Sequence, residues 1–452
     1  MSQALWQWRE LCEALSVDLV GGPDISGISI DSRTVQPGEL FIALTGDPGP
    51  RFNPAQRSDR DGHNFVASAL ERGAAGVLVH DQQTRDCPQL MVNDTLDGLW
   101  ALGRAARNRL RCPVVAVTGS SGKTTVKAML TAALDAFSIP GSLNNHLGVP
   151  LSLARTPAQA QAVIIEIGTN HPGEIAPLSR LTQPDVAIVL NVHPAHRANF
   201  ASMTELRSEK LSISQGLRTG GMLVVHDLID DVEIAATLPR VRFGETEQAD
   251  VQLLSVDGAS AQYRIGDHQL QAHVPGGGVH RALSLAAVLA VTLALGRDPD
   301  SASDLNDDLI PKGRGAQFVA GGITLIDDSY NANPMSMRAA LQTLNAMPGR
   351  RFALLGEMLE LGDDSADFHA GLAEFCEGLT GVFCVGEGMN ALAAKLTPEQ
   401  DLGYWQTADN QLLREIKATL QPGDILLVKG SNLVFWTIGF VDKLSKAITA
   451  DG

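Results

Sequence analysis

One segment constrains the fold of this chain more than any other: an apolar run that passes into a glycine-rich turn and then into a helix-forming stretch. The segment reads Val114-Val115-Ala116-Val117-Thr118-Gly119-Ser120-Ser121-Gly122-Lys123-Thr124-Thr125. In such a unit the backbone N–H groups of the turn and the positive end of the helix bind phosphate oxygens. We therefore expect a buried parallel strand followed by a site for ATP or GTP.

The residues of this turn have separate expected contacts. Lys123 is expected to meet the β and γ phosphates, and the Thr124 hydroxyl to ligate Mg²⁺. The common phosphate-loop pattern has a glycine five residues before Gly122, where this chain has Val117, so the motif departs from that pattern by one residue. A purely structural turn is the alternative interpretation. The expected nucleotide contacts are Gly119, Ser120, Ser121, Gly122, Lys123, Thr124 and Thr125.

Apolar runs that alternate with helical stretches indicate the domain organisation. Such runs lie at 114–117, 163–167, 186–192 and 222–225, and again at 323–326, 352–355, 382–385 and 425–428. Unbroken apolar strands are buried on both faces, which is typical of a parallel sheet covered by helices. We predict an α/β protein of three domains: a small α/β domain at 1–84, a central parallel-sheet ATPase domain at 85–311 and a Rossmann-like domain at 312–452. The stretch 311–315, Pro-Lys-Gly-Arg-Gly, would link the last two.

Composition excludes several classes of protein. A net charge of -16 argues against nucleic-acid binding, which needs clustered Lys and Arg. The five cysteines are scattered without a CxxC spacing, so neither disulfides nor a zinc site is indicated. No stretch near the start resembles a signal peptide, and the longest apolar segment, 283–295, is shorter than a membrane span. We expect a cytoplasmic protein with no membrane span, and a buried helix at 283–295.

Three residues downstream of the turn have chemistry suited to a metal. Glu166 ends the expected strand at 163–167, and a carboxylate at the carboxyl end of a parallel strand points into the ligand crevice, where it can hold Mg²⁺. His196 follows another strand, and Lys210 comes fourteen residues later on an expected helix. Taken alone, such a histidine is more often a capping or surface group, and such a lysine a solvated charge.

The turn from Thr118 to Thr125 resembles the shortened phosphate loop of the Mur ligases, which departs from the common pattern in the same way. The resemblance implies an ATP-dependent amide ligase whose catalytic residues are Lys123, Glu166, His196 and Lys210. It also implies two Mg²⁺ ions, contacted by Thr124, Glu166, His196 and Lys210. Carbamylation of Lys210 follows as a hypothesis.

Two further regions resemble the branch of that family that adds D-alanyl-D-alanine. Asp31-Ser32-Arg33 and Asp61-Gly62-His63-Asn64-Phe65 are similar to its UDP-sugar-binding domain, although turn residues alone would give the same composition. Asn144-Asn145-His146-Leu147-Gly148 is similar to its substrate-contacting loop. The expected substrate contacts are Ser32, Arg33, Asp61, His63, Asn144 and Asn145.

The C-terminal part carries motifs that the resemblance assigns to the nucleotide. The segment Asp327 to Pro334 resembles an ATP-facing motif, with an Asp-rich turn that caps a helix as the structural alternative. The expected contacts are His280, Arg314, Asp327, Asn331 and Asn333. Two departures concern the adenine and the amine substrate: Arg281 stands where the family usually has Asn, and Lys429-Gly430-Ser431 is followed by Asn432 and Phe435-Trp436 in place of Arg and Met-Glu.

The resemblance implies a complete reaction. ATP would phosphorylate a carboxylate, and an amine would attack the acyl phosphate to form an amide. The implied substrates are UDP-MurNAc-tripeptide and D-Ala-D-Ala, the implied state is a monomer, and closure about the linker near Arg314 would bring the reactants together. Two alternatives stay open: a related ligase that joins a different carboxylate and amine, and a non-catalytic ATP-binding scaffold.

Overall fold

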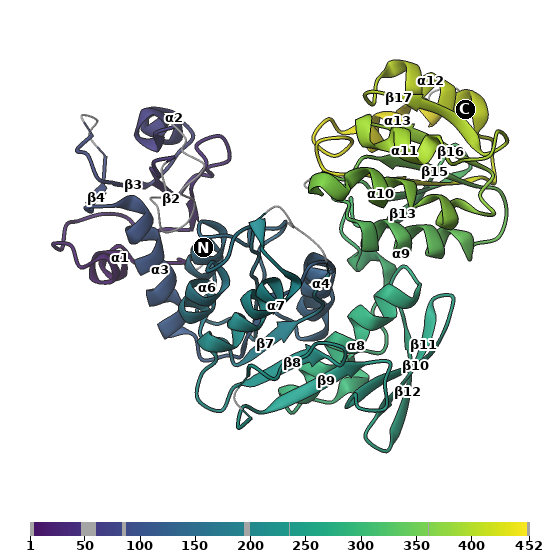
Figure 1. The fold of residues 1–452 in the computed structure, drawn as a ribbon. Helices are drawn as coiled ribbons and strands as arrows, with labels where there is room; N and C mark the ends of the chain where they lie inside the picture. The colour runs from purple at the N-terminus through teal and green to yellow at the C-terminus, as the bar shows by residue number, and fades with distance from the viewer. Residues whose placement is uncertain are drawn as a thin grey trace.

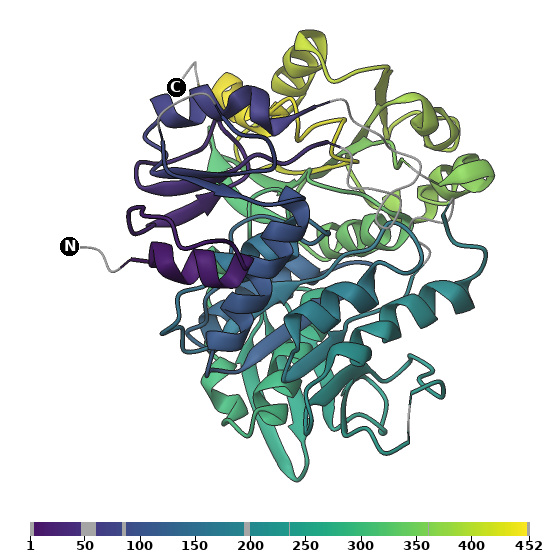
Figure 2. The same ribbon diagram turned by 90° about the vertical axis from the view of Figure 1, so that its left-hand side faces the viewer.

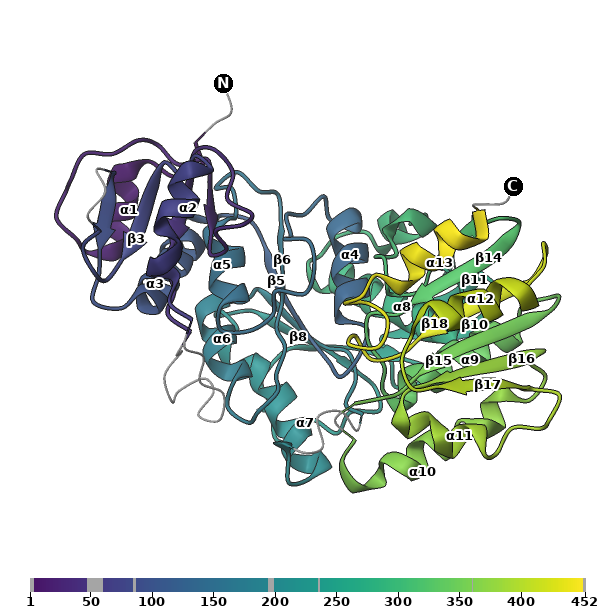
Figure 3. The ribbon, with the colours of Figure 1, turned by 90° about the horizontal axis from the view of Figure 1, so that it is seen from above.

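The structure, a computed structural model, describes residues 4–46, 60–83, 87–193, 199–234, 236–359 and 361–449. Three α/β domains follow one another along the chain, and each has its own sheet (Figure 1). Seen from above, the N-terminal and C-terminal domains lie at opposite ends of the molecule, with the central domain between them (Figure 3). The predicted fold class is confirmed. The segment 46–62 is crowded with Pro, Gly, Arg and Asp, a composition that predicts an exposed loop, and most of it lies outside the described residues.

The N-terminal domain is a small parallel sheet with the strand order β1-β2-β3-β4. Its elements are α1 (Trp8–Leu15), β1 (Gly27–Ser29), β2 (Glu39–Ile42), α2 (Val66–Glu71), β3 (Gly76–Val79) and β4 (Gln89–Met91). Leu40 and Ile42 face one hydrophobic cluster and Phe41 faces another, so both sides of the sheet are buried. β4 lies past residue 84, the expected end of this domain, and we propose a boundary near Asp94, which caps α3 (Thr95–Arg109).

The central domain has a mixed sheet with the order β12-β11-β10-β9-β8-β7-β5-β6. The elements are β5 (Val114–Thr118), α4 (Lys123–Ala133), α5 (Gly148–Ala154), β6 (Val163–Glu166), α6 (Ile175–Thr182), β7 (Val186–Val189), α7 (Met203–Leu211), β8 (Met222–His226), β9 (Arg240–Gly244), β10 (Val251–Asp257), β11 (Ser260–Ile265), β12 (His268–His273) and α8 (Val279–Ala294). Strands β5 to β10 pair in parallel, whereas β10, β11 and β12 pair antiparallel. These last strands extend outward from the domain (Figure 1).

The C-terminal domain has the order β13-β14-β18-β15-β16-β17, parallel except for the β13–β14 hairpin. The elements are β13 (Ala316–Ala320), β14 (Ile323–Asp328), α9 (Pro334–Asn345), β15 (Arg351–Gly356), α10 (Ser365–Ala370), β16 (Gly381–Val385), α11 (Asn390–Ala393), β17 (Asp401–Trp405), α12 (Asn410–Thr419), β18 (Ile425–Lys429) and α13 (Phe440–Thr449). The predicted apolar strands of both later domains are confirmed. The expected buried helix at 283–295 lies within α8, which packs most of its side chains into the core.

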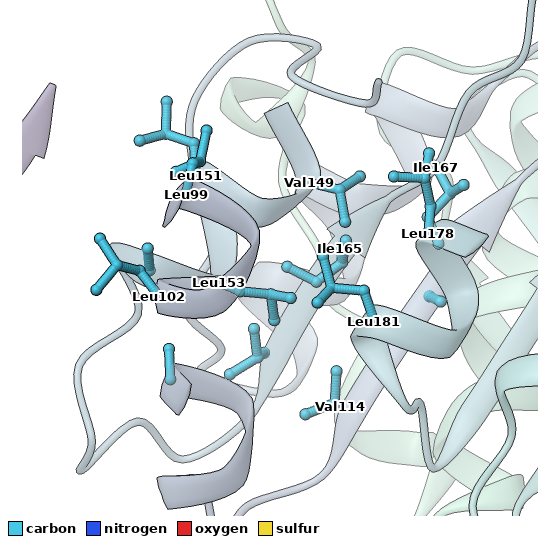
Figure 4. Packing of buried hydrophobic residues seen from close by; sticks show 14 of the residues in the cluster. Leu99, Leu102, Val114, Val149, Leu151, Leu153, Ile165, Ile167, Leu178 and Leu181 are labelled. Atoms are coloured by element: carbon cyan, nitrogen blue, oxygen red, sulfur yellow. The ribbon is translucent and has the colours of Figure 1, made fainter. Parts of the chain in front are cut away.

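The N-terminal and central domains share one hydrophobic core. A single cluster runs from Trp6 and Leu11 of the first domain to Ile165 and Leu178 of the second. Figure 2 shows α1 lying against α3, and Figure 4 shows how leucines of α3, α5 and α6 meet beside β5 and β6. The clusters of the C-terminal domain, in contrast, contain only residues from Ala320 onward. Among the residues that the structure describes, two domains therefore form one packed body, and the third has core clusters of its own.

Two expectations from composition can be compared with the structure. The cysteines carry free thiols, as their scattered spacing predicts. In the ranges that the structure describes, no helix has both the length and the apolar character needed to cross a membrane.

Candidate functional site

A phosphate-binding loop connects β5 to α4. Gly122 stands directly before the helix with φ of 78°, a left-handed conformation that side chains disfavour. The segment after β7 braces this loop: Asn191 Oδ1 accepts a hydrogen bond from the Ser121 N–H at 3.0 Å, and Ser120 Oγ donates to the His193 carbonyl at 3.0 Å. The protein alone therefore holds the loop in shape. Asn191 was not expected from the sequence as part of this site.

Two side chains at the start of α4 face different groups. The Lys123 ammonium folds back over the loop and donates to the Gly119 carbonyl at 2.7 Å. Thr124 is buried, and its hydroxyl donates to the Glu166 carboxylate at 3.0 Å. Thr125, the next residue, is half-buried. The phosphate loop and the strand-end carboxylate thus meet directly.

Glu166 lies at the centre of a polar cluster. Its Oε1 atom accepts hydrogen bonds from Ser142 at 2.7 Å and from Asn144 at 2.8 Å. Burial alone would raise the pKa of this carboxyl, but the charges of Lys123 and Lys127, with the hydrogen bonds of Ser142 and Asn144, hold the pKa below its usual value. The group is therefore ionised at neutral pH.

Lys127, which the sequence analysis missed, belongs to the same cluster. The residue is 6% exposed, and its ammonium donates to the carbonyls of Ile139, at 2.9 Å, and Gly141. It also lies 3.7 Å from the Glu166 carboxylate. Burial lowers the pKa of Lys127, and Glu166 opposes that shift. The signal in the sequence was a second lysine one helical turn after Lys123, on the same side of the helix.

Lys210, near the end of α7, is the other buried lysine of the central domain. It is 2% exposed. Burial, and then the like charge of Lys123, lower its pKa to about 7, while Glu209 opposes the shift. The Glu209 carboxylate accepts hydrogen bonds from the backbone N–H groups of Gly173 and Ile175, each at 2.8 Å, at the start of α6. His196, expected beside Lys210, lies outside the described residues.

The linker to the C-terminal domain brings Arg314 toward the phosphate loop. The Arg314 guanidinium stacks on the Tyr330 ring, 4.0 Å from its centroid, and Tyr330 in turn packs edge-on against Trp436. The charge of Arg314 contributes to the lowered pKa of both Lys123 and Lys127, after the larger effect of burial. In Figures 1 and 3, α4 lies on the side of the central domain that faces the C-terminal domain.

The Asp-rich turn after β14 is largely engaged within the protein. Asp327 accepts hydrogen bonds from the Gly313 N–H at 2.9 Å and from the Ser329 hydroxyl at 2.5 Å. Asn333 caps α9 through the Ser336 N–H, so the structural interpretation of this motif holds for that residue. Asn331 is exposed. Asp327 is thus buried and Asn333 half-buried, so Asn331 is the most accessible of the three expected nucleotide contacts in this turn.

His280 and Arg281 open α8 but lie in different environments. His280 is exposed at the second position of the helix. Arg281, the next residue, is buried and directed toward the linker. The side chain that replaces the family's usual Asn therefore contacts the linker backbone.

The expected substrate residues of the first domain differ in exposure and in their contacts within that domain. Ser32 is buried after β1, and Arg33 is exposed and paired with Asp31 at 2.7 Å. His63 accepts from the His80 N–H through Nε2 at 3.1 Å, and its Nδ1 lies 2.6 Å from Asp61. Both ring nitrogens of His63 are thus engaged inside the domain, and we propose that His63 orders its loop.

The two asparagines of the expected substrate loop, Asn144 and Asn145, have different hydrogen-bond partners. Asn144 joins the Glu166 cluster. Asn145 accepts hydrogen bonds from the N–H groups of Leu147 and Gly148 at the start of α5. The structure therefore gathers Lys123, Thr124, Asn144 and Glu166 at one edge of the central sheet.

The sequence matches two domains of known type. Residues 117–292 match the Mur ligase middle domain, and residues 313–432 match the Mur ligase, glutamate ligase domain. The UDP-N-acetylmuramoyl-tripeptide--D-alanyl-D-alanine ligase of Bacillus subtilis is 31% identical over 90% of this chain and 90% of its own length. The Escherichia coli protein of the same name is 30% identical over 93% of this chain and 94% of its own.

Solved structures agree with the sequence relatives. MurF from Acinetobacter baumannii superposes with a TM-score of 0.82 at 30% identity, covering 98% of this chain and 99% of that one. MurF from Thermotoga maritima in complex with ADP superposes with a TM-score of 0.77 at 26% identity, covering 94% and 98%. From its matched domains, its relatives and its fold, the chain belongs to the Mur ligase family.

Proposed function

We propose that this chain is an ATP-dependent ligase that joins D-alanyl-D-alanine to the peptide carboxyl group of UDP-N-acetylmuramoyl-tripeptide. One observation carries the proposal: Thr124 of the phosphate loop contacts the ionised Glu166 carboxylate, and α4, which follows this loop, lies on the side of the central domain that faces the C-terminal domain (Figure 3). The relatives named above bear the name of this reaction. An ADP-bound relative with the same fold supports ATP as the nucleotide.

The groups at this edge suit phosphoryl transfer to a carboxylate. The N–H groups of the loop and the start of α4 would hold the phosphates, and Lys123 would leave the Gly119 carbonyl to reach their oxygens. A carboxylate oxygen then attacks the γ-phosphorus while the bond to the departing ADP oxygen breaks. The amine attacks the acyl carbon, loses a proton and displaces phosphate. Lys123 and Arg314 supply positive charge where negative charge develops.

The residues present fit a magnesium ion, which the family implies. The Thr124 hydroxyl and the Glu166 carboxylate are oxygen donors only 3.0 Å apart, and oxygen ligands are those that Mg²⁺ prefers. The bound ion would neutralise charge on the phosphoryl group. Among the described residues, no group of three or more His, Cys, Asp or Glu side chains is arranged to hold a metal, so phosphate oxygens and water would complete the coordination. A role for His196 stays a prediction.

The carbamylation hypothesis gains support from the surroundings of Lys210. A buried amine with a pKa of about 7 is substantially neutral at neutral pH. The neutral nitrogen attacks the carbon of CO₂ and loses a proton, which converts the amine into a carbamate anion whose two oxygens resemble a carboxylate. That anion would supply a second set of oxygen ligands. The two Mg²⁺ ions, the monomeric state and the cytoplasmic location stay predictions from the sequence.

An isotope experiment tests the reaction. UDP-MurNAc-tripeptide labelled with ¹⁸O in its terminal carboxyl group should transfer one labelled oxygen to the phosphate that is released. Phosphate that stays unlabelled during product formation would rule out an acyl phosphate. ADP release that needs neither carboxylate nor amine would instead favour the non-catalytic scaffold.

A related ligase with a different amine substrate is the second candidate. The C-terminal departures favour it, because Trp436, which replaces a usual Glu, packs against Tyr330, the residue on which Arg314 stacks. An ADP-release assay with a panel of dipeptides and single amino acids separates the two candidates. D-Ala-D-Ala should give the highest kcat/KM, and a higher value for another amine would select the alternative.

A further inference from the structure

Arg281 is a buried cation in an unfavourable position. It is the third residue of α8 and only 6% exposed. The start of a helix carries partial positive charge, and burial of an unpaired cation is also unfavourable. An arginine at this place therefore needs specific acceptors.

Carbonyl groups from two parts of the chain supply those acceptors. Arg281 Nη1 donates to the Gly276 carbonyl, before α8, at 2.5 Å. Nη2 donates to the carbonyl of Gly315 at 3.0 Å and lies 3.4 Å from that of Arg314. The negative charges of Asp328 and Asp307 also act on the guanidinium. One side chain thus joins the central domain to the linker.

The two glycines leave space for this guanidinium. Gly276 and Gly315 have φ of 71° and 87°, and a methyl group on either would overlap the Arg281 guanidinium. Glycine is therefore favoured at both positions for two reasons: the backbone has a positive φ, and a larger side chain would overlap the guanidinium.

The linker is attached on its other side to the C-terminal domain. Gly313 exchanges hydrogen bonds with that domain, from its N–H to Asp327 and from the Tyr330 N–H to its carbonyl, each at 2.9 Å. The Gly315 N–H donates to the Asp327 carbonyl at 2.6 Å. The linker is therefore bonded on one side to the C-terminal domain and on the other, through Arg281, to the central domain.

We propose that Arg281 is the pivot of the hinge between the central and C-terminal domains, and that it positions Arg314 for the reaction. The guanidinium fixes the linker backbone at Arg314 and Gly315 while the C-terminal domain turns about this point. The role of Arg314 in chemistry rests on the proposed function, whereas the pivot rests on geometry alone. In the family, the usual Asn at this position is expected to approach the adenine. In this chain, Arg281 instead holds the linker at the hinge.

The first measurement is the distance between spin labels introduced through non-natural amino acids at the exposed positions Glu247 and Glu399, in the full chain without substrates. The Arg281→Asn variant should broaden the distance distribution about twofold, because the fixed point is lost. The distance distribution of Arg281→Lys should be narrower than that of Arg281→Asn but broader than that of the wild type. Arg297→Asn, at the other end of α8, is the matched control and should change nothing. An unchanged distribution in Arg281→Asn would overturn the pivot.

Kinetics separate positioning from nucleotide binding. Arg281→Asn should lower kcat about tenfold and change the KM for ATP less than about twofold, because Arg314 is misplaced while the phosphate loop is intact. A change confined to the KM for ATP would overturn the proposal in favour of an adenine contact. If the chain were not a ligase, the kinetic measurement would give no signal, but the distance measurement would still decide the pivot.

A double-mutant cycle covers the case in which Arg281→Asn folds poorly. Gly315→Ala strains the backbone in any background, and in the wild-type chain it also displaces Arg281. It should broaden the distribution in the wild type and add little in Arg281→Lys or Arg281→Asn. Equal broadening in all backgrounds would show that Gly315 acts without Arg281.

Discussion

Lys127 and Lys210 are buried to a similar degree in the central domain, but their electrostatic surroundings differ. Lys127 has two carbonyl acceptors and lies 3.7 Å from Glu166. Lys210 experiences the like charge of Lys123, and the carboxylate of its neighbour Glu209 is already bound to the start of α6. The comparison indicates that burial does not by itself mark a reactive lysine. What matters is whether acceptors accompany the charge.

The largest difference should appear when each lysine is replaced by methionine, which has a similar shape and no charge. Lys210→Met should lower kcat roughly 100- to 1000-fold, because the proposed carbamate ligand of the phosphoryl site is lost. The melting temperature should not fall, since the substitution removes a buried amine whose charged form burial disfavours. Steady-state kinetics and calorimetry measure both. Full activity in Lys210→Met would remove this lysine from the mechanism.

Lys127→Met should lower the stability of the fold more than Lys210→Met does, and the catalytic rate less. The substitution leaves the buried carbonyl of Ile139 without its partner, whereas water can reach the exposed Gly141, and a buried unpaired group costs about 1–3 kcal/mol. The free energy of unfolding, from urea titration, should therefore fall by about 1–3 kcal/mol. Activity should fall less than in Lys210→Met. A stable Lys127→Met variant with a larger loss of kcat would reverse the comparison.

The two lysines should also differ in their reaction with CO₂. Because the pKa of Lys210 is lowered to about 7, this amine is protonated below pH 7 and neutral above it. Carbamate formation, followed by NMR with ¹³C-bicarbonate, should rise between about pH 6 and pH 8 and be lost in Lys210→Met. Lys127 should form no carbamate, since its ammonium hydrogens are donated to carbonyls. Uptake that appears only near pH 10 would contradict the lowered pKa.

The sequence predicted those parts of the fold that depend on apolar patterning. Unbroken runs such as Val186 to Val189 gave the parallel strands, whereas β10 to β12 were missed because polar residues such as Gln252 and Arg264 interrupt their apolar pattern. Thr124 and Glu166, both expected from the sequence at the metal site, lie in direct contact, while their role stays a prediction. Lys127 could have been found from its helical spacing, but Asn191 and Arg281 gained their contacts from chain segments 70 and 34 residues away, which patterning does not reveal.

The smallest expected effect concerns Glu209, whose carboxylate acts on Lys210 but not on Lys127. Its charge raises the pKa of Lys210 against the effect of burial, so Glu209→Gln should lower that pKa further and shift carbamate formation to lower pH. The same substitution weakens the interaction with the start of α6, and the free energy of unfolding should fall by about 0.5–1 kcal/mol. Glu205→Gln, on the same helix and also bound to a backbone N–H, is the matched control and should leave the pH profile unchanged. A shift to higher pH in Glu209→Gln would mean that Glu209 does not act on Lys210 through its charge, and the contrast with Lys127 would then rest on Lys123 alone.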